Sequence, residues 1–138
     1  MKKSEDISAW IVSAKSDFAV AKKGKFSKDV QYETPCFHAQ QTAEKSIKAI
    51  LIHHNIPFQK THNIELLFKL LEKSEINIPK IIKPATELTK YAVTTRYPDD
   101  FDMQDKIDKK EYKHAVALAA KVLEWAKKII QQDKRKLF

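Results

Sequence analysis

The chain holds a single glycine, Gly24, among its 138 residues, where an average composition would give about ten. Glycine adopts positive φ without strain, so tight turns between strands and loops that wrap around phosphate groups depend on it. Hairpin-rich β folds, the P-loop and the glycine-rich dinucleotide-binding turn are therefore all disfavoured. The length fits one domain, and we expect that domain to be all-α.

Apolar residues recur every three or four positions along most of the chain, which is the period of an α-helix. The pattern predicts a compact antiparallel up-and-down bundle of four to five helices. We assign residues 1–131 to one helical domain and residues 132–138 to a basic tail that frays. The expected helices run from about Ser4 to Lys22, from Thr34 to about His54, over Ile64–Leu71, from near Asn77 to Tyr97 at the latest, and from Asp108 to about Ile129.

Residues at the ends of the second and third helices resemble helix caps. Thr34 followed by Pro35 predicts an N-cap with proline at the first helical position. Thr61 or Asn63 is expected to cap the third helix.

Further boundary signals lie at the other helices. Asp108 and Glu111 have the spacing of a capping box at the start of the last helix. Pro84 falls inside the fourth expected helix, where it predicts a kink or a later start. Gly24, which follows two lysines, is expected to end the first helix.

The charge balance is basic, with 26 Lys and Arg against 18 Asp and Glu, for a net charge of +8. This permits contact with nucleic acid, nucleotides or an acidic partner. The lone Cys36 excludes an internal disulfide, and no Cys/His spacing is typical of a structural zinc site. No apolar run approaches about 18 residues, and the N-terminus lacks the apolar core of a signal peptide. We expect a cytoplasmic protein with no membrane contact and no bound metal or cofactor, a nucleotide being the candidate ligand.

Several polar side chains project into apolar helix faces. At about 100° per residue, Gln40 and Glu44 fall within the apolar arc of the second helix, and Gln41 and Lys48 lie at its border. On the fourth helix, Arg96 lines up with an apolar row made of Ile81, Ala85, Leu88 and Ala92. A buried carboxylate is costly unless it is paired, so we predict that Glu44 pairs with Arg96. Two interpretations stay open: a structural bridge, within the bundle or across a dimer seam, or a polar cleft that holds a ligand.

Four blocks of the sequence resemble the HEPN domain family (higher eukaryotes and prokaryotes nucleotide-binding). The segment from Cys36 to Ala49, CFHAQQTAEKSIKA, is similar to the signature of the family's second helix. The segment Thr61–Ile64 with the leucines after it, the block Arg96-Tyr97-Pro98-Asp99, and the alanine-rich last helix ending in Trp125 resemble the next blocks. The blocks come in the family's order and cover nearly the whole chain.

The resemblance implies a helical bundle that commonly dimerises. Many prokaryotic members are encoded beside a minimal nucleotidyltransferase as toxin–antitoxin partners, and many are metal-independent ribonucleases with an R-x4-6-H motif. Here His114 lies 18 residues beyond Arg96, and no histidine follows Arg135, the only other arginine. The chain therefore lacks the motif and resembles an RYP-type subgroup for which ribonuclease activity does not follow.

These observations favour a HEPN-domain module that binds a nucleotide or a nucleotidyltransferase of toxin–antitoxin type. An atypical metal-independent ribonuclease, and a helical dimerisation domain whose polar residues are purely structural, are the alternatives. We expect a homodimer, because one bundle of this size has difficulty covering Trp10, Tyr32 and Trp125, and nucleotide or RNA as ligand. No catalytic or metal-binding residue is assigned; the ligand-binding candidates are Arg96, Tyr97, Asp99, Gln41, Glu44, Lys45, Lys48 and His62.

Three other sets of potentially reactive side chains are expected to have structural roles only. His62 is expected to help cap the third helix or to pack in the loop before it. His53 and His54 are interpreted as solvated surface at a helix end, and Cys36 as a small buried residue.

Overall fold

The computed structural model describes residues 3–92 and 106–136, with side chains described as far as residue 133. No strand occurs within these ranges, which confirms the all-α class. The elements in chain order are α1 (Lys3–Lys23), α2 (Glu33–His53), α3 (Ile64–Lys73), the 3-10 helix η1 (Lys83–Tyr91) and α4 (Lys109–Lys136).

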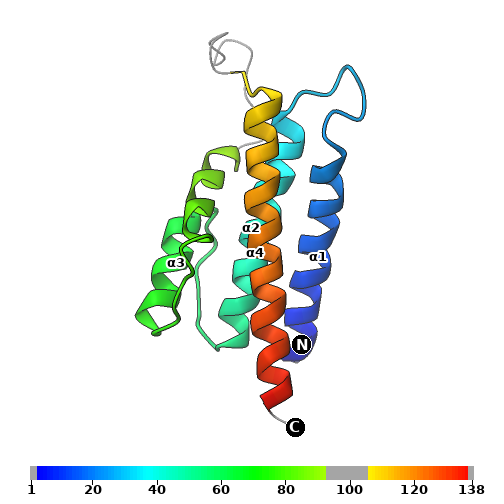
Figure 1. The fold of residues 1–138 in the computed structure, drawn as a ribbon. Coiled ribbons are helices and arrows are strands. Elements are labelled where there is room, and N and C mark those ends of the chain that lie inside the picture. The colour runs from blue at the N-terminus through cyan, green and yellow to red at the C-terminus, as the bar shows by residue number, and fades with distance from the viewer. Residues whose placement is uncertain (1–2, 93–105, 137–138) are drawn as a thin grey trace.

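The three long helices α1, α2 and α4 lie side by side, and α3 with η1 forms a shorter flanking layer (Figure 1). Ile7 near the start of α1 packs in one cluster with Ile130 near the end of α4, so these two helices run antiparallel. The hydroxyl of Tyr112, at the start of α4, donates to the carbonyl of Ala21, at the end of α1, over 2.6 Å. Both described chain ends consequently lie at the same end of the bundle (Figure 1).

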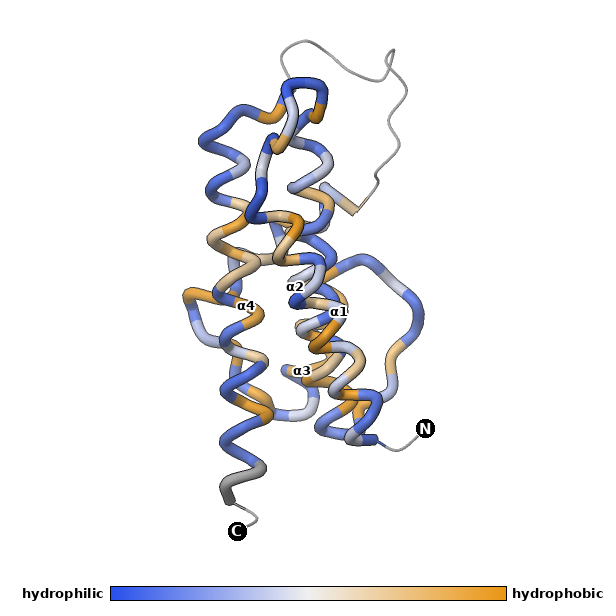
Figure 2. Tube along the Cα trace, turned by 90° about the vertical axis from the view of Figure 1, so that its right-hand side faces the viewer, coloured by the Kyte–Doolittle hydropathy of each residue, from blue (hydrophilic) through white to orange (hydrophobic). Residues whose placement is uncertain are grey.

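The helix α2 is the centre of the molecule, since it packs against every other helix and is buried along most of its length. On α1 the buried side chains are Ile7, Ala14 and Ala21, one every seven residues. Alanine at two of these positions lets α1 approach α2 closely. Figure 2 shows hydrophobic and hydrophilic residues alternating along α4, as expected for a helix with one face on the core.

Most of the predicted helix ends are confirmed. Gly24 has φ +60° directly after α1. Oδ1 of Asn63 accepts a hydrogen bond from the backbone N–H of Leu66, at 3.4 Å, and caps α3. Oδ1 of Asp108 accepts from the backbone N–H of Glu111 at 2.8 Å, so it caps α4.

The start of α2 differs from the prediction. Thr34 is not the N-cap: the helix begins at Glu33, and Tyr32 occupies the cap position without a side-chain hydrogen bond. The first backbone bond runs from the N–H of Cys36 to the carbonyl of Tyr32, at 3.0 Å. Because no N–H in the first turn needs a partner within the helix, Pro35 is tolerated beyond the first position and does not fix the start.

The fourth predicted helix is a 3-10 helix that begins at Lys83, six residues later than predicted. Its buried residues Ala85, Leu88 and Tyr91 are spaced by three, the period of a 3-10 helix. Ile81, which we placed on the buried face, is 64% exposed. The projection that defined this face assumed an α-helix, which Lys83–Tyr91 does not form; Arg96 itself lies outside the described residues.

Two other expectations change in the structure. The helix α4 continues to Lys136, past residue 131, where we expected the helical domain to end. Trp10, Tyr32 and Trp125 are each half-buried within one chain, so uncovered aromatic surface gives no reason to expect a dimer. No helix in the described ranges has the length and apolarity needed to cross a membrane.

Candidate functional site

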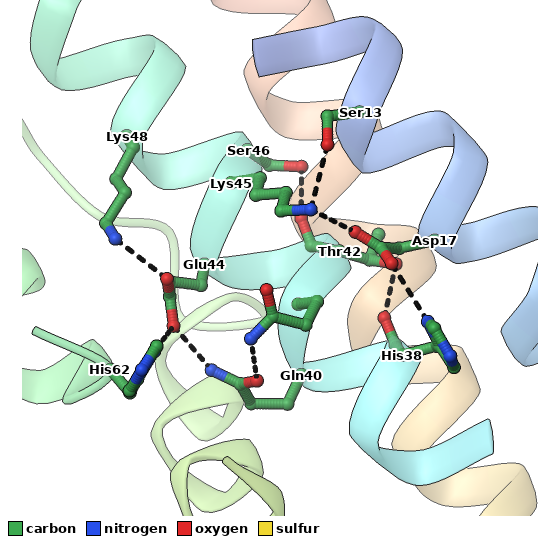
Figure 3. A network of polar contacts seen from close by, with 11 residues as sticks. Ser13, Asp17, His38, Gln40, Thr42, Glu44, Lys45, Ser46, Lys48 and His62 are labelled. Atoms are coloured by element: carbon green, nitrogen blue, oxygen red, sulfur yellow. Dashed lines mark hydrogen bonds and ion pairs between the residues drawn. The ribbon is translucent and has the colours of Figure 1, made fainter. Parts of the chain in front are cut away.

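The carboxylate of Glu44 is the centre of a polar cluster on the side of α2 that faces α3 (Figure 3). Its Oε1 accepts hydrogen bonds from Nε2 of Gln40 and from Nδ1 of His62, each at 2.7 Å. Its Oε2 lies 2.7 Å from Nζ of Lys48. Nε2 of Gln41 donates to Oε1 of Gln40 at 2.8 Å, which extends the cluster. We refer to these five residues as the Glu44 cluster.

Three of its members form a row along α2, because residues spaced by four lie on one side of a helix. Gln40 is fully buried, Glu44 is 3% exposed and Lys48 is 6% exposed, as the helical projection indicated for the first two. Every buried side-chain nitrogen and oxygen atom in the described residues has a hydrogen-bond partner. The row is therefore a buried polar network in which every side-chain nitrogen and oxygen atom is satisfied.

Two opposing effects determine the protonation of Glu44. Burial raises the pKa of the Glu44 carboxyl, whereas hydrogen bonds from Lys48, His62 and Gln40 lower it. The net effect is a pKa below the usual value for glutamate. Glu44 is thus a carboxylate at neutral pH.

The ammonium group of Lys48 is held by aromatic rings as well as by Glu44. Its Nζ lies 5.5 Å from the centre of the Trp10 ring and 5.8 Å from that of Phe58. Both distances are within the range of cation–π attraction. The cluster therefore joins α1, α2 and the loop before α3.

His62 is the member of the cluster that reaches solvent. Its side chain is 63% exposed, while the Glu44 side chain to which it is bonded is 4% exposed. Of the two roles expected for His62, capping of α3 falls to the next residue, Asn63, and packing in the loop before α3 is the one observed. The contact of His62 with Glu44 fixes the loop to α2.

A second polar cluster lies between α1 and α2, on another side of α2 (Figure 3). Nζ of Lys45 donates to Oδ2 of Asp17 at 2.7 Å and to Oγ of Ser13 at 2.8 Å. Nδ1 of His38 lies 2.9 Å from Oδ1 of Asp17. Lys45, which we grouped with Glu44 as a ligand-binding candidate, therefore belongs to a different site.

The structure thus brings together four of the eight candidates, namely Gln41, Glu44, Lys48 and His62. Arg96, Tyr97 and Asp99 lie outside the described residues, so the predicted contact between Arg96 and Glu44 stays a prediction. Sequence analysis missed Asp17. Asp17 lies between Ala14 and Ala21 on the buried stripe of α1. An acidic residue on an apolar helix face is the same sequence signal that identified Glu44.

The titratable side chains of Cys36, Tyr91 and His53, all within the described residues, lie outside both clusters. Burial is the main cause that raises the pKa of the Cys36 thiol to about 12, so Cys36 is an inert buried residue, as predicted. Burial also raises the pKa of Tyr91, whose hydroxyl donates to Glu111. The side chain of His53 is only 16% exposed, and its Nε2 lies 2.6 Å from Oδ2 of Asp133, so His53 is not the solvated residue we expected.

The fold and the site together define the class of protein. It is an all-α bundle whose second helix carries a row of buried polar residues that are paired with one another. The family model for the HEPN domain matches residues 7–130, nearly the whole chain. The chain belongs to the HEPN family.

Two solved structures are similar to this chain over most of its length. One is ST0689, an archaeal HEPN homologue, with 27% identity and a TM-score of 0.70 over 90% of this chain and 97% of that one. The other is TT1696 from Thermus thermophilus, with 26% identity and a TM-score of 0.71 over 88% of this chain and 96% of that one. No curated protein matches the chain significantly.

Proposed function

We propose that this HEPN-domain protein is a binding module for a nucleotide and a partner of a minimal nucleotidyltransferase, as in toxin–antitoxin pairs. One observation carries the proposal: the buried Glu44 carboxylate holds the exposed imidazole of His62 by its Nδ1 atom, at 2.7 Å. A hydrogen bond to one ring nitrogen fixes the orientation of the ring and directs the other nitrogen elsewhere. Nε2 of His62 is thereby positioned to meet a ligand.

The charges of the Glu44 cluster indicate which part of a nucleotide it would contact. Glu44 and Lys48 form an ion pair in which both side chains are less than 10% exposed. Their charges compensate each other, so this cluster supplies little attraction for a phosphate group. His62, together with the half-buried amide of Gln41, suits hydrogen bonding to a base or a ribose. Under this proposal, phosphate binding falls to Arg96.

A thermal-shift titration with purified nucleotides tests the proposal. We expect at least one nucleotide to raise the melting temperature, and His62→Ala or Gln41→Ala to reduce the shift. His114→Ala is the matched control, because His114 is also an exposed histidine, 59% exposed and 3.0 Å from the carboxylate of Glu87. Absence of any shift over the common nucleotides would instead support the structural dimerisation domain.

The partner role requires a separate measurement. The nucleotidyltransferase encoded nearest to this gene should elute with the purified protein as one complex in size-exclusion chromatography after coexpression. Separate elution of the two proteins at micromolar concentration would contradict this part of the proposal and leave nucleotide binding untouched.

One observation favours the alternative of an atypical ribonuclease. A carboxylate that orients a histidine through Nδ1 is a common arrangement for a general base, and Glu44 with His62 has it. Cleavage also needs a cation for the charge that develops on the phosphorane. Lys48, the ammonium in this cluster, is buried and paired, so it does not face a phosphate.

We therefore expect no strong ribonuclease activity from the purified protein. The assay uses structured and unstructured RNAs, with and without Mg²⁺, and compares the parent protein with His62→Ala and Arg96→Ala. Turnover that either substitution abolishes would establish the enzyme. Turnover that neither changes would indicate a contaminant or another site.

A further inference from the structure

Three side chains that commonly ligate metal ions meet where α2 and α4 end. His53 is the last residue of α2, His54 is its C-cap, and Asp133 lies in the last turn of α4. One ligand atom from each of the three residues lies within 4.8 Å of those of the other two. We propose that His53, His54 and Asp133 form a binding site for a divalent transition-metal ion such as Zn²⁺.

The geometry is close to that of a three-ligand site. Tetrahedral zinc with bonds of about 2.0–2.1 Å separates its ligand atoms by about 3.3 Å. Nε2 of His53 and Oδ2 of Asp133 are 2.6 Å apart, and the widest pair is within 4.8 Å, so small side-chain rotations reach the required spacing. The two imidazole rings make an edge-to-face contact, with centroids 5.0 Å apart and planes at 77°, so one ring has to rotate before both can present a nitrogen to the same ion. Three protein ligands leave the fourth position for water.

The donor atoms determine the class of ion. Two imidazole nitrogens and one carboxylate oxygen suit Zn²⁺, Co²⁺, Ni²⁺ or Cu²⁺. Mg²⁺ and Ca²⁺ require sets of oxygen ligands, which these residues do not supply. The positive charge of Lys3 acts on His54 and would oppose a bound cation.

Metal binding at this place has a clear structural consequence. His53 and Asp133 are 80 residues apart in sequence, so an ion that replaces their direct contact ties together the ends of two helices. Because the three ligands are brought together only in the folded chain, an ion that binds them stabilises the fold. His53, whose side chain is 16% exposed, and Asp133, at 38%, remain accessible to an ion from solvent.

The test uses the full chain without a histidine tag. We expect excess Zn²⁺ to raise the melting temperature by about 3 °C or more, and Mg²⁺ at the same concentration to leave it unchanged. His54→Gln and Asp133→Asn should abolish the Zn²⁺ shift, and Co²⁺ added to the parent protein should give the visible absorption of a tetrahedral site. His114→Ala, which removes a histidine beside another carboxylate, should keep the shift.

Circular dichroism of each variant first confirms the helical fold. For a variant of reduced stability, isothermal titration calorimetry with Zn²⁺ gives the number of ions bound per chain. One ion per chain, lost in His54→Gln, supports the site. A parent protein that shows no Zn²⁺ shift, or a shift that His54→Gln and Asp133→Asn leave intact, would overturn it.

Discussion

Replacing Glu44 by glutamine tests the energetics of the polar row most directly. The substitution keeps the shape of the side chain and removes its charge, so the ammonium of Lys48, whose side chain is 8% exposed, loses its carboxylate. Breaking a buried ion pair from one side costs about 3–5 kcal/mol. We expect about 3 kcal/mol, because Nζ of Lys48 keeps the rings of Trp10 and Phe58 and each such contact contributes about 1 kcal/mol.

The effect of Lys48→Met should be smaller than that of Glu44→Gln. Glu44 then keeps its hydrogen bonds from His62 and Gln40, so we expect a cost of about 2 kcal/mol. In the double variant neither charge is left buried alone. Its cost should fall at least about 2 kcal/mol below the sum of the two single costs.

Urea unfolding followed by circular dichroism measures all three variants, and thermal unfolding checks them. A cost of about 3 kcal/mol corresponds to a fall of about 12 °C in melting temperature for a domain of this size. Glu87→Gln is the matched control, since Glu87 is a carboxylate bonded to a histidine but is 56% exposed, and it should change stability by less than about 0.5 kcal/mol. A cost below about 1 kcal/mol for Glu44→Gln, or full additivity in the double variant, would refute the reasoning.

Three further predictions concern pH, assembly and Arg96. The pKa of Glu44 is lower in the folded state than in the unfolded state. The charged carboxylate therefore stabilises the fold above the unfolded-state pKa of about 4.3, and this stabilisation is lost as the pH falls through the folded-state pKa. The difference in unfolding free energy between the parent and Glu44→Gln, measured in urea, should shrink from pH 5 toward pH 3. A homodimer is still expected because the resemblance to HEPN domains implies a bundle that commonly dimerises, although the half-buried aromatic residues do not require one. Light scattering at micromolar concentration should give twice the 16.0 kDa chain mass, and a monomer mass would exclude the dimer. The guanidinium of Arg96 should lie within direct or one-water reach of Glu44 in an experimental structure, and a separate, solvated position for each would be the contrary result.

Helix positions could be predicted from sequence because they depend on local signals. The buried face of α3 and the caps Asn63 and Asp108 follow from periodicity and side-chain chemistry within a few residues. The 3-10 helix could not be recognised in the same way, since an apolar spacing of three fits both helix types over a short segment. Its residues Ala85, Leu88 and Tyr91 distinguish the two types only once their burial is known.

The candidate site could be predicted only where it lies on a helix. The projection of α2 identified Glu44 and Gln40 because a regular helix fixes which face each residue occupies. His62 comes from a loop, where no period links sequence position to direction, so its bond to Glu44 had no sequence signal. Asp17 did have one, as an acid on the buried stripe of α1, and the rule that identified Glu44 would have found it.

The polar row of α2 is not needed for stability as such. Replacing a buried ion pair by apolar side chains of similar volume is often neutral or stabilising. The amide of the buried Gln40 donates to Glu44, so it must be replaced too, and the combination of Gln40→Leu, Glu44→Leu and Lys48→Met should fold at least as well as the parent. That variant removes the acceptor that orients His62, whose own side chain stays exposed. If the bundle keeps its stability and loses its response to nucleotides, the row acts by positioning His62 for a ligand. If both properties are unchanged, binding does not depend on the oriented histidine, and the network serves only to specify how the loop before α3 packs on α2.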